Sequence, residues 1–215
     1  MELVDAMRTT GSVRDFRAEP VPLSTIYQVL DSARFAPSGG NRQGWRVIVV
    51  TEPAVRSALG ELFRAGWYGY HEPVFAAGRP VQRWDYADHI EGVPVHLVVL
   101  AAEASITTTI EALDASRLVG GSSVYPFVQN VLLGLRDKSL GTTLTTVLVT
   151  VEAKVKELLK VPPGYLIAAH MTVGWPARAL PTRLRRRSVD EFTTVDSFDG
   201  EPLRAGPEPS ELVDQ

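Results

Sequence analysis

The sequence predicts one domain in which a β-sheet is layered with helices, and two observations lead to this. The chain has 215 residues, 45% of them apolar, which is enough for one sizeable core. Segments with helical spacing of apolar residues alternate with short β-branched runs, with no repeat and no linker between them. Such interspersed helices and strands are typical of a sheet covered by helices.

The first part of the chain predicts three helices and one strand. Prolines fix the backbone of "SVRDFRAEPVP", so residues 12–22 are expected to be extended. The next helix takes Ser24 as its N-cap and places Ile26, Val29, Leu30 and Ala33 on one face. In order, we expect a helix at residues 2–8, this second helix, a polar loop at 35–45, a buried strand at 45–50 and a helix at 53–64.

Residues 65–92 are aromatic and glycine-rich without a steady period. This segment is either a surface excursion packed by its own side chains or a mobile cover over a flat ligand. The rest predicts a strand at 93–101, a helix at 120–138, a polar turn continuing as a strand over 141–150, a helix at 151–160 and a strand at 165–176. Beyond these lie an arginine cluster, a short apolar segment at 189–196 and a Pro/Glu tail, 199–215, that we expect to be disordered.

Composition excludes several classes of function. A formal net charge of −3 argues against nucleic-acid binding by the whole molecule. The chain has no cysteine, which rules out disulfides and thiolate chemistry. No apolar run or signal pattern indicates a membrane or secretory segment, so we expect a cytoplasmic protein. His71, His89, His96 and His170 show no metal-ligand spacing, and the two inside strands are expected to be core residues.

Four polar clusters remain as candidates for a site. One contains Arg8, Ser12 and Arg14; the others are the loop Ser38–Gln43, the turn Thr142–Thr146, and Arg183, Arg185, Arg186 and Arg187. Guanidinium forks and hydroxyls together suit a phosphate. The stretch "FAPSGGNRQGW" holds more polar residues than a turn needs, and we interpret it as wrapping a planar cofactor with polar edges. Each cluster taken alone also fits a solvated surface or ordinary strand.

Four stretches, in order, resemble the nitroreductase-like, FMN-dependent oxidoreductase family. They are "RTTGSVRDFRAEPVP", "ARFAPSGGNRQGWRVIVV", "GGSSVYPFVQNVLLGLRDKSLGTTLTTVL" and "VGWPARALPTRLRRRSVDEF", and together they cover roughly residues 5–195. The resemblance implies an α+β fold with a central, mainly antiparallel sheet flanked by helices, in one domain over residues 1–198. It also implies an intertwined homodimer, with 122–138 as the long interface helix and 189–196 as a strand that crosses to the partner. Two FMN sites would then lie at the interface, each built from both subunits.

The resemblance also assigns site residues. The FMN phosphate would be held by Arg8, Ser12, Arg14, Arg186 and Arg187, although "TTG" stands where the family has arginines directly before the serine. The isoalloxazine ring and ribityl chain would be lined by Pro37, Ser38, Gly39, Asn41 and Gln43. Leu144, Thr145 and Thr146 would face the pyrimidine end of the ring, with Thr145 and Thr146 supporting N5. Gly44 replaces the family's usual proline and is expected to loosen the start of the strand.

The resemblance implies an NAD(P)H oxidoreductase in which flavin N5 passes a hydride to a small acceptor such as a nitroaromatic or quinone, with NADH or NADPH as reductant. No catalytic dyad and no metal is needed, because the flavin carries the chemistry. Stacking against the acceptor is assigned to Tyr68, Tyr70, Phe75 and Trp84, for which packing under the loop is the alternative. The rival interpretations are dehalogenase or flavin-cleaving chemistry in the same family, an FMN store or sensor, and a module that binds an acidic partner.

Overall fold

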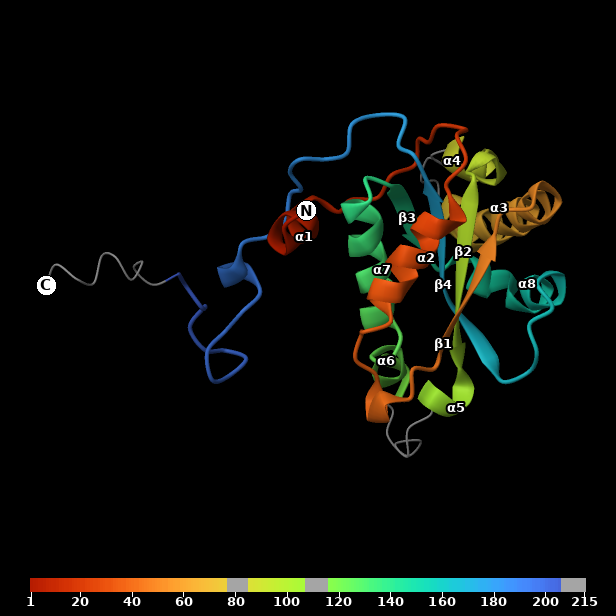
Figure 1. The fold of residues 1–215 in the computed structure, drawn as a ribbon. Helices are drawn as coiled ribbons and strands as arrows, with labels where there is room; N and C mark the ends of the chain where they lie inside the picture. The colour runs from red at the N-terminus through yellow and green to blue at the C-terminus, as the bar shows by residue number, and fades with distance from the viewer. Residues whose placement is uncertain (77–84, 107–115, 206–215) are drawn as a thin grey trace, which may run out of the picture. The chain divides into compact units, whose positions relative to one another are not determined.

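A four-stranded antiparallel sheet forms the centre of the described part of the chain (Figure 1). This computed structural model describes residues 1–76, 85–106 and 116–205. The strands are β1 (Trp45–Val50), β2 (Val95–Ala102), β3 (Gly141–Thr145) and β4 (Tyr165–Gly174), in the order β1-β2-β4-β3. Every neighbouring pair is antiparallel. The α+β class and the mainly antiparallel sheet are therefore confirmed.

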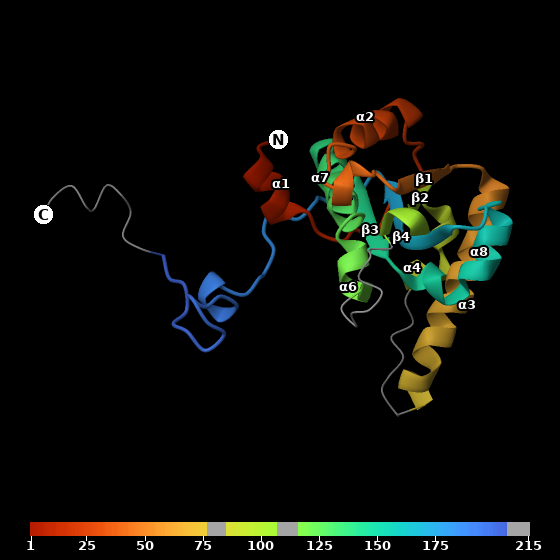
Figure 2. The ribbon, with the colours of Figure 1, turned by 90° about the horizontal axis from the view of Figure 1, so that it is seen from below.

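Helices cover both faces of this sheet (Figures 1 and 2). One face carries α2 (Leu23–Ala33) and α7 (Tyr125–Asp137), and the other carries α3 (Pro53–Ala76), α4 (Asp85–Asp88) and α8 (Glu152–Leu158). The remaining helices are α1 (Leu3–Thr9), α5 (Glu103–Ile106), α6 (Ser116–Gly121) and the 3-10 turns η1 (Gly39–Asn41), η2 (Ile90–Gly92), η3 (Val147–Val151) and η4 (Val189–Glu191).

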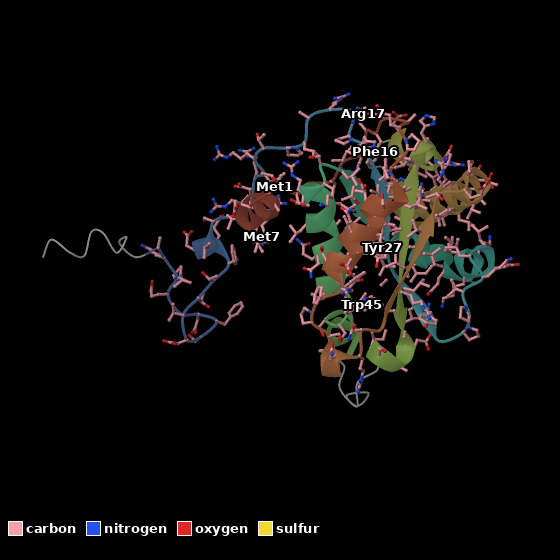
Figure 3. All side chains as sticks on the ribbon, viewed as in Figure 1. Met1, Met7, Phe16, Arg17, Tyr27 and Trp45 are labelled. Carbon is pink, nitrogen blue, oxygen red and sulfur yellow. The ribbon has the colours of Figure 1, made fainter. Side chains whose placement is uncertain are left out.

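The two faces form two separate cores because side chains alternate along each strand. In β2, Leu97 and Val99 pack with α2 and α7, whereas Val98 packs with α3, α4 and α8. Trp45 at the start of β1 stacks on Phe127 of α7, with ring centroids 4.8 Å apart. On the outer side of α2, Tyr27 remains exposed (Figure 3). The buried and exposed faces of α2 are those that its apolar spacing predicts.

Several predicted element boundaries are wrong. Helix α3 continues to Ala76 instead of ending at residue 64, so the first part of the predicted excursion is helical. Residues 147–151 form the 3-10 turn η3, not a continuation of the strand. The predicted helix 120–138 is divided between α6 and α7, and Ser24 lies inside α2, whose N-cap position is Pro22.

Two compact units make up the chain, residues 1–182 and residues 183–215. In the second unit, residues 189–196 form η4 and turns within the single chain. A strand that crosses to a partner needs a second chain to pair with, so the crossing strand, the interface helix and the dimer stay predictions. Residues 206–215 of the predicted disordered tail lie outside the described residues. Across the described ranges, no helix combines the length and apolarity needed to span a membrane.

Candidate functional site

The N-terminal segment that carries Ser12 and Arg14 lies along the sheet edge formed by β3. The amide of Val13 donates to the carbonyl of Thr142 at 2.8 Å, and the Thr143 hydroxyl donates back to the carbonyl of Val13. A Cβ on Gly141 would approach Val13 Cγ1 to 2.7 Å, so glycine permits this close contact. These hydrogen bonds to Val13 therefore hold Ser12 and Arg14, both exposed, beside β3.

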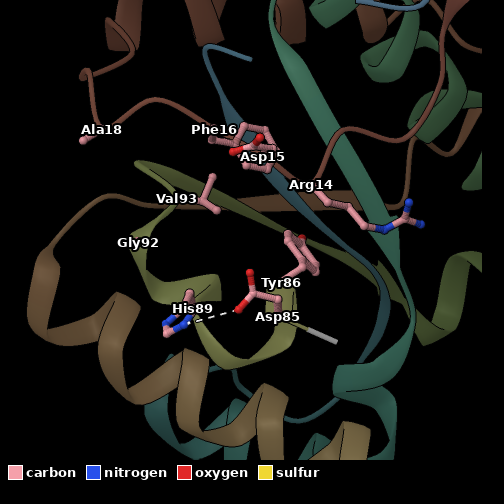
Figure 4. Close-up of a pocket in the computed structure, with 9 residues that line it drawn as sticks. All are labelled: Arg14, Asp15, Phe16, Ala18, Asp85, Tyr86, His89, Gly92 and Val93. Atoms are coloured by element: carbon pink, nitrogen blue, oxygen red, sulfur yellow. Dashed lines mark ion pairs between the residues drawn. The ribbon is translucent and has the colours of Figure 1, made fainter. Parts of the chain in front are cut away.

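A pocket of about 280 Å³ opens beside this segment (Figure 4). It is lined by Arg14, Asp15, Phe16, Ala18, Asp85, Tyr86, His89, Gly92 and Val93. The Arg14 side chain extends away from the Asp85–His89 ion pair, past Tyr86 (Figure 4). The Tyr86 hydroxyl shares a 2.6 Å hydrogen bond with that of Thr172, and burial raises the pKa of Tyr86 to about 12. Tyr86 is thus a neutral phenol in the wall of this pocket.

The end of β3 presents its side chains to opposite sides. Leu144 and Thr146 are exposed, whereas the Thr145 hydroxyl oxygen is buried and has no hydrogen-bond partner. Between Leu144 and Thr145 this alternation follows from the pleat of the strand, whereas Thr146 lies just beyond β3, at the N-cap position of η3. The exposed groups at this end are therefore Leu144 and Thr146, and the hydroxyl of Thr145 is directed into the protein.

The loop Pro37–Gln43 is held by its own hydrogen bonds. Ser38 Oγ accepts from the Gln43 amide at 3.0 Å, and Gln43 Nε2 donates to Asn41 Oδ1 at 3.1 Å. The Gly39 amide donates to Ser123 Oγ, just before α7, at 3.0 Å. Asn41 and Gln43 have positive φ values, 52° and 50°, which are uncommon for non-glycine residues. The polar residues thus give the loop a defined conformation on an exposed surface.

The sequence predicts that Gly44, at the end of this loop, loosens the start of β1. The structure shows instead that Gly44 is closely packed. Its carbonyl accepts from the Ala102 amide at 2.8 Å, and a Cβ at this position would lie 2.2 Å from the Cβ of Ser105. Glycine is needed here because α5 packs directly against the backbone.

The predicted flavin residues lie at two different edges of the sheet. Ser12, Arg14 and Leu144–Thr146 lie at the β3 edge, whereas Pro37–Gln43 lead into β1, the opposite edge strand. Three strand spacings separate these edges, about 14 Å. Arg8 is exposed in the last turn of α1. Arg186 and Arg187 belong to the second unit, which is described by itself.

The four aromatic residues proposed for the acceptor have different surroundings. Tyr68 donates a hydrogen bond to Asp88 Oδ1 and so links α3 to α4. Tyr70 is 64% exposed on α3. Phe75 belongs to the last part of α3, and Trp84 lies outside the described residues. The structure describes the side chains of Tyr68 and Tyr70. Tyr68 is half-buried, whereas Tyr70 is exposed to solvent.

The pairing of two buried histidines was not apparent from the sequence. His96 of β2 and His170 of β4 are both buried, with His96 Nδ1 3.0 Å from His170 Nε2. Burial lowers the pKa of His96 to about 4 and lowers that of His170 well below its usual value. Their strand positions predicted core residues, and the structure confirms that. Among the described residues, no group of His, Asp and Glu could hold a metal ion.

Comparison with known proteins agrees with this architecture. Residues 7–175 match the model of the Nitroreductase family. The nitrobenzene nitroreductase of Ectopseudomonas oleovorans is 25% identical over 218 residues, covering 88% of this chain and 95% of its own. The 5,6-dimethylbenzimidazole synthase of Rhodospirillum rubrum is 30% identical over 176 residues, 79% of each chain.

Among solved structures, an oxidised iodotyrosine deiodinase bound to FMN and 3-iodo-L-tyrosine shares the fold. It superposes with a TM-score of 0.71 at 22% identity, covering 90% of this chain and 100% of that one. Taken with the match over residues 7–175, these observations show that the chain belongs to the nitroreductase family.

Proposed function

We propose that this protein is an FMN-dependent NAD(P)H oxidoreductase that reduces a small acceptor such as a nitroaromatic or a quinone. The observation that carries the proposal is the division of the candidate residues between two exposed sheet edges. An arginine, hydroxyls and an apolar side chain lie at the β3 edge, and a structured polar loop precedes β1. A second copy of the chain would supply the missing half of each site, so the proposal includes a homodimer.

The residues at these edges fit FMN chemically. Arg14 and Ser12, with Arg8, Arg186 and Arg187, would hold the phosphate through charge-assisted hydrogen bonds. Pro37, Ser38, Gly39, Asn41 and Gln43 would line the ring and ribityl chain. Because the loop is already hydrogen-bonded internally, little ordering is needed on binding. The bound FMN supplies hydride transfer at N5.

The protein's own contribution at the β3 edge is positioning and exclusion of water. Leu144, which is exposed, would cover the ring with an apolar side chain, and the exposed Thr146 would direct its hydroxyl toward N5. Thr145 supports this arrangement from inside, since its hydroxyl is directed into the core. Tyr70 is the described aromatic residue best exposed for stacking on the acceptor, with Tyr68, Phe75 and Trp84 as the other members of that assignment.

The named relatives include a nitroreductase, a synthase and a deiodinase. Reductive dehalogenation and flavin cleavage are therefore the alternative chemistries at the same site. A turnover screen with nitroaromatic, quinone and haloaromatic substrates, each with and without oxygen, separates them.

The test of the main proposal is the visible absorption spectrum of the purified protein, repeated anaerobically with NADPH and with NADH. We expect an oxidised-flavin spectrum that bleaches with at least one nucleotide. Arg14→Gln should weaken FMN binding by about 10-fold or more, because it removes a charged hydrogen-bond partner of the phosphate.

Arg17→Gln is the matched control, because Arg17 lies on the same segment but pairs with Glu19. This variant should keep its FMN. A colourless protein that takes up no added FMN would contradict the cofactor assignment. Bound flavin that persists with both nucleotides would contradict the oxidoreductase activity and favour storage or sensing.

A further inference from the structure

Thr145 and His170 are direct cross-strand partners at the end of the sheet. The register of β3 and β4 pairs Thr145 with His170, and the two side chains of such a pair lie on the same face. Ala169 and Met171, the neighbours of His170, belong to the core beside α2 and α7. His170 therefore faces the other core, where its ring lies 5.7 Å from that of Phe63. Cβ atoms of opposed residues are about 5 Å apart, close enough for polar groups to be linked.

The hydrogen bonds of the histidine pair determine which ring nitrogens carry protons. His96 Nε2 lies 3.1 Å from the carbonyl oxygen of Ile90, and a carbonyl can only accept, so Nε2 of His96 is protonated. In the neutral ring Nδ1 of His96 is then an acceptor. His170 Nε2, 3.0 Å away, must donate to it. This leaves Nδ1 of neutral His170 as an unprotonated acceptor.

On this face, one buried polar atom can donate a hydrogen bond and another can accept one. Within the described residues, His170 Nδ1 and Thr145 Oγ1 are both buried and both lack a hydrogen-bond partner. His170 is 1% exposed, so bulk water does not reach its ring. Buried polar groups in folded proteins are nearly always paired with protein or ordered water. The threonine hydroxyl is a donor and the imidazole nitrogen is an acceptor, which makes them suitable partners.

We propose that the Thr145 hydroxyl donates a hydrogen bond to His170 Nδ1 through one buried water, and that His170 is a positioning residue for the end of β3. The bond would fix the Thr145 side chain in the core beside α3, and so keep Leu144 on the opposite face of the sheet and Thr146 exposed just beyond the strand. The functional part of this inference rests on the proposed flavin site, whereas the hydrogen bond itself does not.

The hydrogen bond is tested without flavin, by ¹⁵N NMR of the imidazole rings in the full chain. Thr145→Val should shift the His170 Nδ1 resonance toward that of a free acceptor, and Thr145→Ser should keep it near the wild-type position. Thr142→Val is the matched control. It also removes a partnerless buried hydroxyl from β3, but Thr142 pairs with Val173, which faces the other core. Equal shifts in the Thr145→Val and Thr142→Val proteins, or none in either, would overturn the proposal.

The positioning role is tested by FMN titration of the same variants together with two at His170. His170→Asn keeps an acceptor near the position of Nδ1, and His170→Leu removes it. We expect Thr145→Val and His170→Leu to weaken FMN binding about fivefold, as the loss of one typical hydrogen bond would, and Thr145→Ser and His170→Asn to restore most of it.

Unchanged FMN affinity in all four variants, together with the NMR shift, would overturn the positioning role and leave the hydrogen bond in place. If wild-type protein binds no FMN, the proposed function fails, and the NMR comparison still decides whether the hydrogen bond exists.

Discussion

Gly44 illustrates, at the scale of one residue, how a loop is held against the sheet. Its backbone carbonyl is bonded to Ala102, and Ser105 of α5 occupies the space where a side chain would begin. A close approach of this kind is a reason for glycine that is independent of turn geometry. The loop before β1 is therefore packed from both sides, by Ser105 at its end and by Ser123 at Gly39.

Gly44→Ala should lower the free energy of unfolding by about 1–3 kcal/mol, since the added methyl overlaps Ser105. Urea unfolding measures the change. The control is Gly69→Ala on α3, where a Cβ would meet nothing within 4 Å and alanine should stabilise the helix by about 0.5–1 kcal/mol. Ser105→Gly combined with Gly44→Ala should recover much of the loss. A Gly44→Ala protein as stable as the wild type would contradict the prediction, because α5 would then accommodate the added methyl group without loss of stability.

At the scale of the elements, β2 and β4 bring two histidines together inside a core. Burial is the main cause that lowers the pKa of His96, and Arg56 lowers it further while the Ile90 carbonyl and Glu91 raise it. Burial, with His96 as a second cause, lowers the pKa of His170. Both rings are therefore neutral in the folded protein near pH 6, where the unfolded chain has begun to protonate them.

This predicts that stability falls with acidification below pH 6.5. The unfolded chain then binds protons that the folded chain does not, so the free energy of unfolding decreases as the pH drops from 6.5, the ordinary pKa, to about 4, the folded pKa of His96. The slope should reach about 1.4 kcal/mol per pH unit for each histidine. Urea unfolding at pH 7.5, 6.5 and 5.5 measures it. His89→Asn, at an exposed position, should keep the slope, and a pH-independent stability would refute the prediction.

The segments beside the two sheet edges are also held by different hydrogen bonds. The β3 edge is built by hydrogen bonds between Val13 and the strand itself, whereas the β1 edge is reached through a loop that bonds to Ser123. Because β1 and β3 are the outer strands, no shift of one loop within the chain would merge the two sets of residues. The arrangement suits a site completed by a second chain.

At the scale of the whole molecule, residues 183–205, the described part of the second unit, bury little of their apolar surface. Phe192 is 60% exposed and Phe198 is 100% exposed. Large exposed apolar side chains gathered in a short segment usually mark a contact surface. We interpret this unit as the part of the chain that a second copy covers.

Analytical ultracentrifugation should therefore find a species of twice the mass of one chain. Phe198→Asp should weaken self-association by about 10-fold or more, because burying a phenylalanine contributes about 2 kcal/mol. It should also lower the FMN content if the proposed site is built from both chains. Phe198→Leu keeps the apolar contact and is the control. A wild-type protein that sediments as a monomer yet binds FMN would contradict the shared site.

Local patterns in the sequence determined a large part of this protein. The β-branched run "WRVIVV" forms β1 at residues 45–50, and the spacing of Ile26, Val29 and Ala33 gives the buried face of α2. The order of polar motifs along the chain was enough to identify the family, as the match over residues 7–175 shows. Each strand, helix face and motif depends on neighbours within a few residues, and the order of the motifs can be read along the chain, so the sequence carries these features directly.

Only the tertiary structure decided features that depend on distant partners. Val147 and Leu148 have strand-forming composition, yet η3 packs them against the core beside α3 instead of extending β3. The register of β3 and β4 placed the Thr145 side chain on the same face of the sheet as His170, and the strand order separated the loop before β1 from Arg14. Pairing and burial between segments far apart in the chain set these outcomes, and no local window of residues contains that information.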